Sequence, residues 1–311
     1  MTDRSRTTNL PQTIWQRREF INAIGTLGAS ALLMMPGSAI AGELFLPKQN
    51  MTVQQVIDLI LKSIPGAPFK QTVDTIKAGD PNQVVKGIVT TMFATVEVIE
   101  KTAKAGANFI IAHEPTFYNH QDDTKWLEND EVYKYKAALL EKHKIVVWRF
   151  HDYIHAHKPD GVMAGLLTAL GWEKGVDPQK PYLLTIPSTS LGSIIALTKK
   201  KLNIAHLRYI GDKNQPCSRI SFIPGAAGGK TQMNAIATEK PDLLIIGELE
   251  EWETSEYVRD LRASGAKTSL LVLGHIVSEE PGLEWLETWL QPQIPSIKIT
   301  HIPSGDAFSW A

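Results

Sequence analysis

Four short hydrophobic runs, each followed by polar side chains, constrain the fold of this chain more than any other feature. They span residues 107–112, 145–148, 243–246 and 269–273 and consist mostly of apolar side chains, many of them β-branched. Runs of this length and composition predict buried β-strands. In an open α/β sheet, ligands bind just beyond the carboxyl ends of the strands. We therefore expect a site where these runs end.

The side chains that follow the runs are imidazoles and carboxylates. Imidazole and carboxylate groups are the usual protein ligands of divalent metal ions. The pattern therefore predicts a dinuclear metal centre at the strand ends. In chain order, the candidate residues are His113, Glu114, His151, Asp152, His155, Glu248, His275 and Glu279.

Each cluster also has an ordinary structural explanation when it is taken alone. His275 and Glu279 are four residues apart, so they could form an ion pair at the start of a helix. His113 and Glu114 could be a polar strand end, and the three histidines within 151–157 could belong to a solvated loop. Because all three clusters follow predicted strands, together they favour a metal site.

Residues 1–41 predict a twin-arginine signal peptide rather than part of the fold. Arg17 and Arg18 precede an apolar stretch at about 24–35, and a small-x-small cleavage site ends at Ala41. This order of charged, apolar and small residues is typical of an export signal. The apolar stretch is too short to span ~30 Å of hydrocarbon. We expect export to the periplasm, or elsewhere through the twin-arginine route, with no stable membrane span.

Charge and cysteine content exclude several classes of protein. The chain has 32 basic and 33 acidic side chains, and removal of the signal would take away four arginines and two acidic residues, leaving a net charge of about −3. This balance gives no electrostatic attraction for nucleic acid. Cys217 is the only cysteine, so neither an intramolecular disulfide nor a thiolate zinc cluster is possible. Any metal must be held by His, Asp and Glu.

From residue 51 onwards, helical and strand patterns alternate, which predicts an α/β protein with largely buried strands. The proline-rich segment 178–187 is expected to connect two lobes, at about 42–177 and 178–311. Predicted helices lie at about 52–60, 96–105, 132–143, 161–170, 191–202, 230–237 and 284–290, and two further strands lie at about 84–91 and 219–223.

Several segments together resemble motifs of a known family. They lie at 74–81, 112–117, 151–155, 161–171, 225–229, 246–248 and 274–282. The last segment matches the pattern Gly-His-x-x-Ser/Thr-Glu-x-Pro-Gly closely. On these segments the chain, from about Met51 to Phe308, resembles the Ngg-one-interacting-factor-three-like family, whose members are also called GTP cyclohydrolase 1 type 2.

The resemblance implies two interlocked three-layer α/β/α lobes with mixed sheets, a toroidal homohexamer, and two divalent metal ions per subunit, such as Zn, Fe or Mn. Glu114 stands where the family has a histidine, and His155 stands where it has an aspartate. This exchange is reciprocal, so three imidazoles and two carboxylates are kept. Asp152, Glu248 and His151 are expected to support the ligands or transfer protons. The implied ligands are His113, Glu114, His155, His275 and Glu279.

These features predict an exported dinuclear metal-dependent hydrolase that acts on a small molecule through a water bridging the two ions. The substrate is not identified by the sequence. One alternative is a toroidal protein that stores or delivers metal without turnover. Another is a scaffold that binds a partner protein, whose cavity would be filled or free of metal. An open coordination position beside a cavity would favour the hydrolase.

Overall fold

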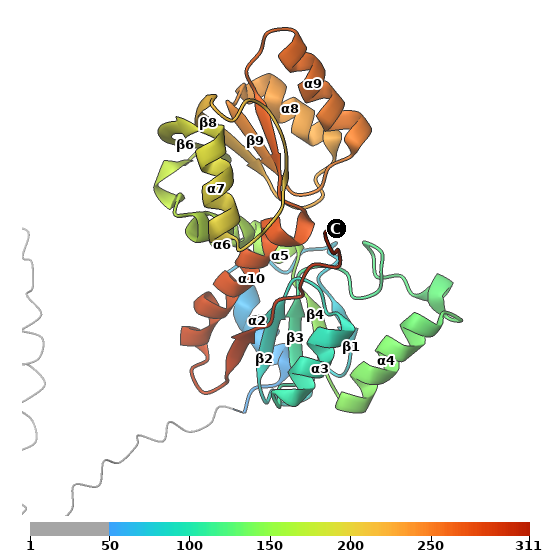
Figure 1. Ribbon diagram of the computed structural model, residues 1–311. Coiled ribbons are helices and arrows are strands. Elements are labelled where there is room, and N and C mark those ends of the chain that lie inside the picture. The colour runs from blue at the N-terminus through green and yellow to red at the C-terminus, as the bar shows by residue number, and fades with distance from the viewer. Residues whose placement is uncertain (1–49) are drawn as a thin grey trace, which may run out of the picture. The chain divides into compact units, whose positions relative to one another are not determined.

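The computed structural model describes residues 50–311, so the predicted signal and its cleavage site lie outside the described residues. The described chain forms two mixed β-sheets, each covered by helices on both faces (Figure 1). This arrangement confirms the predicted α/β class with mixed sheets. Among residues 50–311, no helix combines the length and the apolar character needed to cross a membrane.

The first sheet has the strand order β1-β4-β3-β2-β11, in which only β1 runs antiparallel to its neighbour. Helices α2 (Val53–Leu61) and α10 (His275–Leu290) cover one face, and α3 (Val96–Lys104) and α4 (Glu131–His143) cover the other. The strands are β1 (Ile76–Ala78), β2 (Ile88–Thr91), β3 (Phe109–Ala112), β4 (Val146–Arg149) and β11 (Ile299–His301).

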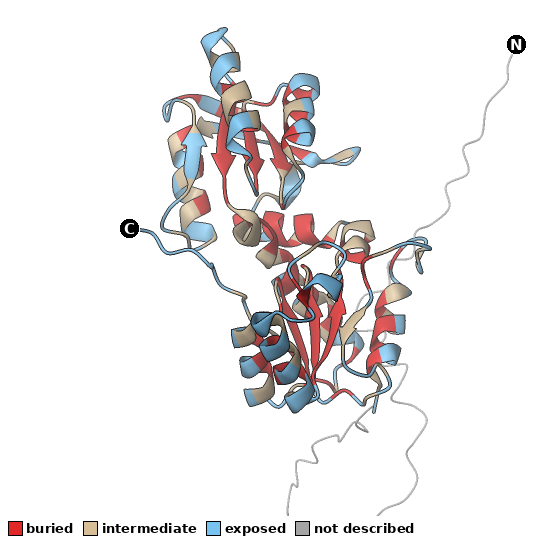
Figure 2. Cartoon of the chain, turned by 90° about the vertical axis from the view of Figure 1, so that its right-hand side faces the viewer, coloured by how far each residue is buried: buried red, intermediate tan, exposed pale blue. Residues whose placement is uncertain are grey.

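Strand β3 shows how this sheet is held between its two helix layers. Phe109 and Ile111 pack in the core beneath α2 and α10, whereas Ile110 and Ala112 pack beneath α3 and α4. Side chains alternate between the faces of a strand, so an entirely apolar run fills both cores. Each fully buried large side chain contributes about 1.5–3 kcal/mol of apolar transfer free energy. Figure 2 shows the strands buried and the outer faces of the helices exposed.

The second sheet has the order β5-β6-β8-β9-β10-β7, with β8, β9 and β10 parallel to one another. Helices α6 (Gly161–Leu170) and α7 (Leu191–Lys201) cover one face, and α8 (Gly229–Glu239) and α9 (Glu256–Ala263) cover the other. The strands are β5 (Val176–Asp177), β6 (Lys180–Ser190), β7 (Arg208–Ile210), β8 (Pro216–Ile223), β9 (Leu243–Ile246) and β10 (Ser269–Val272). Helix α5 (Asp152–Ala156) and short turns at Lys125–Leu127, Glu173–Gly175, Glu251–Ser255 and Gln291–Gln293 complete the described elements.

Most of segment 178–187, which we predicted to connect two lobes, belongs to strand β6, which begins at Lys180. Its prolines misled the prediction because proline usually interrupts a strand. Pro187 lies between Thr185 and Thr189, where the register of β6 against β8 shifts. The irregularity accommodates the missing N–H of proline, so the strand continues to residue 190.

Helix α10 links the two sheets. It begins just beyond β10 of the second sheet, and its apolar residues Leu283, Leu286 and Leu290 lie in the core of the first. The chain then ends its regular structure in β11, which pairs with β2 of the first sheet. The C-terminal segment therefore returns from the second sheet to the first, and this return interlocks the two sheets.

Helices α6 and α10 cross at very close range. A Cβ atom at Gly165 would overlap the carbonyl of Pro281, and one at Gly282 would lie 2.7 Å from Val162 Cα. Only glycine permits backbones to approach this closely. The crossing fixes the first turns of α10 against α6.

Candidate metal centre

Three chain segments bring candidate ligands to one place. His113 and Glu114 directly follow β3, and His151 directly precedes α5. His155 lies one turn later in α5, and the first turns of α10 carry the pair His275 and Glu279. The predicted meeting of polar strand ends is therefore present, and it includes both sheets.

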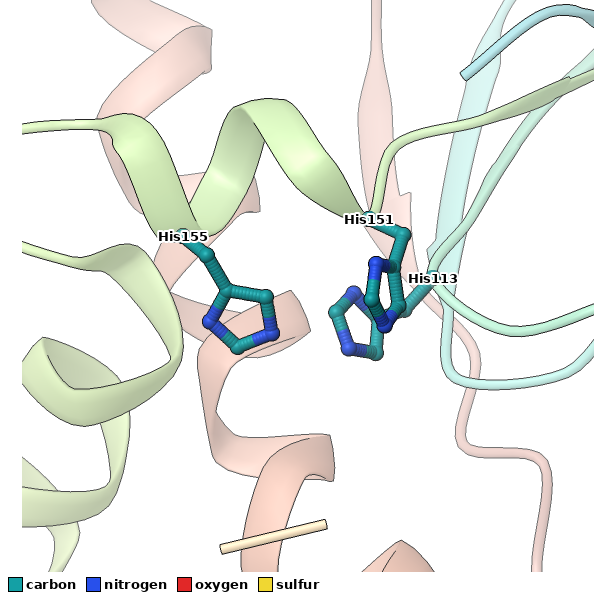
Figure 3. Close-up of side chains that lie close together, drawn as sticks. All are labelled: His113, His151 and His155. Carbon is teal, nitrogen blue, oxygen red and sulfur yellow. The ribbon is translucent and has the colours of Figure 1, made fainter. Parts of the chain in front are cut away.

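Three imidazoles form one half of the cluster. The ring centroids of His113, His151 and His155 lie 4.7–5.2 Å apart. One nitrogen from each ring can be chosen so that all three lie within 4.8 Å of one another. Figure 3 shows the rings of His151 and His155, from opposite ends of α5, facing the same space as His113. A spacing of four residues places both α5 rings on one helical face.

Two carboxylates and a fourth imidazole form the other half. His275 Nε2 lies 3.0 Å from Glu279 Oε2 and 3.3 Å from Glu114 Oε1. Glu279 Oε2 is also 3.3 Å from His113 Nε2, so this contact joins the two halves. The predicted ligands all lie in the cluster, together with His151.

Every histidine of the cluster is oriented by an acceptor behind it. In each case Nδ1 faces a carbonyl or a carboxylate oxygen, which must accept the hydrogen bond. In His113, His151 and His155, Nδ1 therefore carries the proton of the neutral ring, and Nε2 presents a lone pair to the cluster. In His275, Nε2 faces the carboxylate oxygens of Glu279 and Glu114 and donates to them as well. The pairs are His113 with Phe150 O at 3.2 Å, His151 with Asp152 Oδ1 at 2.9 Å, His155 with Asp160 Oδ2 at 3.0 Å and His275 with Glu248 Oε1 at 2.8 Å.

The donor set fits a divalent metal ion. His113 is fully buried, and its Nε2 has no hydrogen-bond partner among the described residues, although Glu279 Oε2 lies 3.3 Å away. A buried ring nitrogen without a partner is costly unless something else satisfies it. A cation surrounded by imidazoles and carboxylates would satisfy this nitrogen and the neighbouring carboxylates together.

A buried arginine lies behind Glu114. Arg149 Nη2 is 3.4 Å from Glu114 Oε2, and its Nε donates to the carbonyl of His113 at 3.2 Å. The same guanidinium donates to the carbonyl of His120 and lies 3.5 Å from Asp122 Oδ2. Arg149 thus fixes one oxygen of Glu114 and leaves the other, Oε1, facing His275 and His151.

Asp74 holds helix α5 in place. Its Oδ1 accepts from the backbone N–H groups of His151 and Asp152, and its Oδ2 accepts from that of Tyr153. These are the donors that the first turn of a helix leaves without partners. Burial raises the pKa of Asp74 even though the three hydrogen bonds oppose this effect. The carboxylate therefore sets the direction from which His151 and His155 enter the cluster.

The electrostatics of the cluster keep its carboxylates ionised. Burial opposes charge on His275, but the carboxylates of Glu114 and Glu279 outweigh it and raise the pKa of His275 to about 10. Burial likewise opposes charge on Glu279, yet His113 and His275 hold its pKa well below the usual range. Burial and the nearby His113 lower the pKa of His151 to about 4. Ionised carboxylates and neutral imidazole, here at His151, are the forms that bind metal.

A cavity of about 650 Å³ opens beside the cluster. The cluster lines it on one side, and residues of β8, α8 and the turn between them line it on the other, including Phe222, Ala227, Asn234 and Ala235. Its volume is within the range of small-molecule sites. The cavity therefore has the candidate metal ligands on one side and apolar and uncharged polar side chains on the other.

The structure brings further residues to the predicted set. His151 lies among the candidate ligands, and its spacing of four from His155 is the sequence signal for this. Asp160 and Arg149 were not predicted: both are close in sequence to cluster histidines, but no pattern marks a single charged residue as a support for a neighbouring side chain. His157 does not contribute: it is buried between Trp285 and Trp289, with Nδ1 2.7 Å from the carbonyl of Pro159.

Comparison with known proteins supports the resemblance seen in the sequence. A family model described as Duf34/NIF3 (NGG1p interacting factor 3) matches residues 51–306. A protein of Clostridium perfringens named GTP cyclohydrolase 1 type 2 homolog is 26% identical over 246 residues, which cover 75% of this chain and 88% of that protein. A protein of Chlamydia pneumoniae with the same name is 27% identical over 238 residues, covering 75% of this chain and 90% of its own.

Solved structures show the same fold. A hypothetical protein of Staphylococcus aureus superposes with a TM-score of 0.68 at 19% identity, covering 84% of this chain and 100% of its own. A Bacillus cereus protein related to NIF3 gives a TM-score of 0.68 at 15% identity, covering 84% of this chain and 99% of its own. At these identities the likeness establishes the fold alone.

Proposed function

The chain belongs to the Duf34/NIF3 (NGG1p interacting factor 3) family, and from this premise we propose that it is an exported hydrolase that depends on two divalent metal ions. The observation that carries the proposal is the convergence of ring nitrogens and carboxylates, with the buried Nε2 of His113 lacking any hydrogen-bond partner among the described residues. The cavity beside the cluster supports a catalytic role over storage or delivery of metal, because storage needs no room for a substrate.

When bound, a pair of such ions would supply an activated water and stabilise the negative charge that develops on a substrate oxygen. The chain's own residues prepare the site for this. Asp152, Asp160 and Glu248 fix the rings of His151, His155 and His275, respectively, so that each Nε2 faces inward. Glu248 has a 57% exposed side chain, which places it to exchange protons between His275 and solvent.

The substrate is proposed to be a small molecule, and the name of the relatives is not carried over to this chain. Among the described residues that line the cavity there is no lysine or arginine. These are the side chains that usually bind the phosphates of a nucleotide such as GTP. The metal ions would be the only strong cationic groups facing a substrate.

We also propose export and assembly into a hexamer. Export rests on the twin-arginine motif at Arg17 and Arg18, which lies outside the described residues. Assembly rests on the family resemblance and agrees with exposed apolar side chains near α4, where Trp126 is 64% and Tyr135 is 58% exposed. Light scattering coupled to size-exclusion chromatography would measure the assembly, and a monomer would contradict it.

Reconstitution with metal tests the hydrolase proposal. Protein stripped with a chelator would be reloaded with Zn²⁺, Fe²⁺ or Mn²⁺, and screened against phosphoesters, amides and nucleosides. We expect turnover only after reloading, its loss in Glu279→Gln, and its retention in His206→Ala, a change at an exposed histidine outside the cluster. Metal bound at the cluster with no turnover across the screen would favour storage or delivery instead.

A further inference from the structure

The donors of the centre are sorted by chemical type into two sets. Three imidazoles, His113, His151 and His155, form the first set. His275 forms the second with the two glutamates: its Nε2 is 3.3 Å from Glu114 Oε1 and 3.0 Å from Glu279 Oε2. Each set offers three donor atoms. The 3.3 Å contact between His113 Nε2 and Glu279 Oε2 is where the two sets meet.

Fixed contacts behind the donors keep the two sets apart. Arg149 holds Oε2 of Glu114, so that Oε1 faces the cluster, 3.3 Å from His275 Nε2 and 3.8 Å from His151 Nε2. One donor atom each of His113, Glu114 and Glu279 also lies within 4.8 Å of the others, so His113 borders both sets. Helix α5 holds His151 and His155, which are four residues apart, on one side. Asp160 orients the ring of His155. The exchange of Glu and His at positions 114 and 155 thus leaves three imidazoles on one side and both carboxylates, with His275, on the other.

We propose that the two sets are unequal metal subsites: an imidazole subsite that includes His151 and prefers borderline ions such as Zn²⁺ or Fe²⁺, and a carboxylate subsite that accepts harder ions such as Mn²⁺. Imidazole suits zinc and iron, whereas carboxylate oxygen suits manganese and magnesium. Charge acts in the same direction, because the imidazole subsite is neutral and the carboxylate subsite brings two negative charges to its ion. This inference rests on the proposed dinuclear centre and assigns His151 a direct role in it.

Two metal ions, each added alone to the full-length protein, test whether the two subsites have different metal preferences. The visible spectrum of the first equivalent of Co²⁺ reports on the imidazole subsite, because nitrogen-rich tetrahedral Co²⁺ absorbs strongly. Electron paramagnetic resonance of Mn²⁺ reports on the carboxylate subsite. Loss of an outer support costs about 10- to 100-fold in metal affinity, so loss of a ligand should cost at least about 100-fold.

We expect His151→Ala to abolish the strong Co²⁺ band and to leave Mn²⁺ affinity within about threefold. Glu114→Gln should weaken Mn²⁺ binding and leave the Co²⁺ spectrum intact, and His206→Ala should change neither. Circular dichroism would confirm that each variant is folded. Equal losses for both ions in both variants would overturn the sorting while leaving a metal centre in place. If the unmodified protein bound neither ion, the proposed function would fail as well.

Reversing the exchange gives a second test. The double variant Glu114→His with His155→Asp has the same number of imidazoles and carboxylates but mixes them between the two sides. We expect this variant to bind both Co²⁺ and Mn²⁺, with a weaker Co²⁺ band and without a difference in metal preference between the two subsites. A double variant that still separated Co²⁺ from Mn²⁺ as the original does would show that positions 114 and 155 do not set the preference.

Discussion

Asp160 Oδ2 lies 3.0 Å from Nδ1 of His155, while Oδ1 of the same carboxylate caps helix α6. It accepts hydrogen bonds from the backbone N–H groups of Val162 and Met163 at 2.9 and 3.1 Å. One side chain therefore supports both the orientation of a cluster histidine and the start of the helix that crosses α10. The two roles can be separated by substitution.

Asp160→Asn should weaken metal binding with little loss of stability. Asparagine caps a helix about as well as aspartate, but its amide cannot cap α6 and also accept from His155 as strongly as a carboxylate. We expect metal affinity to fall by about 10- to 100-fold, measured by competition with a chelating dye. Asp160→Ala should lose affinity similarly and also about 1 kcal/mol in the free energy of unfolding. Unchanged affinity in both variants would place the Asp160 contact outside the metal site.

Gly225→Ala should displace Glu279. Gly225 has a φ of +66°, and a Cβ atom there would overlap the carboxylate of Glu279. Gly228 is the matched control, because its φ is +79° and no atom lies within 4 Å of its added Cβ. Both alanines would add backbone strain of about 1–3 kcal/mol, but only Gly225→Ala should reduce metal affinity. Titration calorimetry would compare them, and an equal effect in both would implicate strain rather than Glu279.

Arg149→Met should destabilise the fold strongly. Arg149 is fully buried and neutralises Glu114 and Asp122. Removing one partner of a buried ion pair typically costs about 3–5 kcal/mol, because a charge is left without compensation. Arg208→Met is the control: Arg208 pairs with Glu251 on the surface, where a pair is worth about 0–1 kcal/mol. Urea unfolding would give both values, and similar small losses would mean that water reaches the Arg149 site.

Lys136 should make stability depend on pH in the alkaline range. Burial lowers the pKa of Lys136 to about 8 although Asp122 opposes this, and its Nζ donates to the carbonyl of Thr116 at 2.6 Å. Below pH 8 both folded and unfolded chains carry the proton. Between pH 8 and about 10.5 only the unfolded chain does, so Lys136 makes stability rise with pH, by at most about 1.4 kcal/mol per pH unit.

Lys136→Met should lack this rise. Urea unfolding at pH 7, 9 and 10 would measure the difference in stability between the variant and the unmodified protein, which removes the contribution of other titrating groups. We expect that difference to shift in favour of the unmodified protein as the pH increases. A difference independent of pH would show that Lys136 keeps its proton in the folded protein throughout this range.

Arg17→Lys with Arg18→Lys should retain the protein inside the cell, because the arginine pair is what the twin-arginine route reads. If metal is loaded before export, the retained precursor should contain it. Cell fractionation followed by elemental analysis would measure location and metal together. Efficient export of a metal-free His275→Ala variant would show that loading and transport are not coupled.

The positions of the cluster residues followed from the sequence because strand ends are marked by an abrupt change from apolar to polar side chains. The run ending at Ala112 places His113 at the edge of a parallel sheet, and the same reasoning applies to His275 after β10. The fold class followed from the same runs. The strand patterns did not indicate that the C-terminal helix and last strand leave the second sheet and pack on the first sheet.

Other features depend on contacts that no local pattern contains. Asp160 reaches His155 through the turn before α6, and Arg149 looks like an ordinary charged residue at the end of a strand although it is fully buried. Strand β6 was missed because its prolines outweighed the apolar residues between them. The position of His151 beside His155 could have been predicted, since a spacing of four residues is helical. Short helices such as α5, however, contain too few residues for a clear periodic signal.

Helix α10 has a consequence for the order in which the chain acquires its structure. His275 and Glu279 at its start need partners from segments more than 100 residues earlier, and Leu286 and Leu290 near its end must dock on the first sheet. Such distant pairings form late, after the intervening elements have closed. The proposed ions could therefore be bound only by a nearly complete molecule, and tight retention of metal would act as a checkpoint that distinguishes finished chains from folding intermediates.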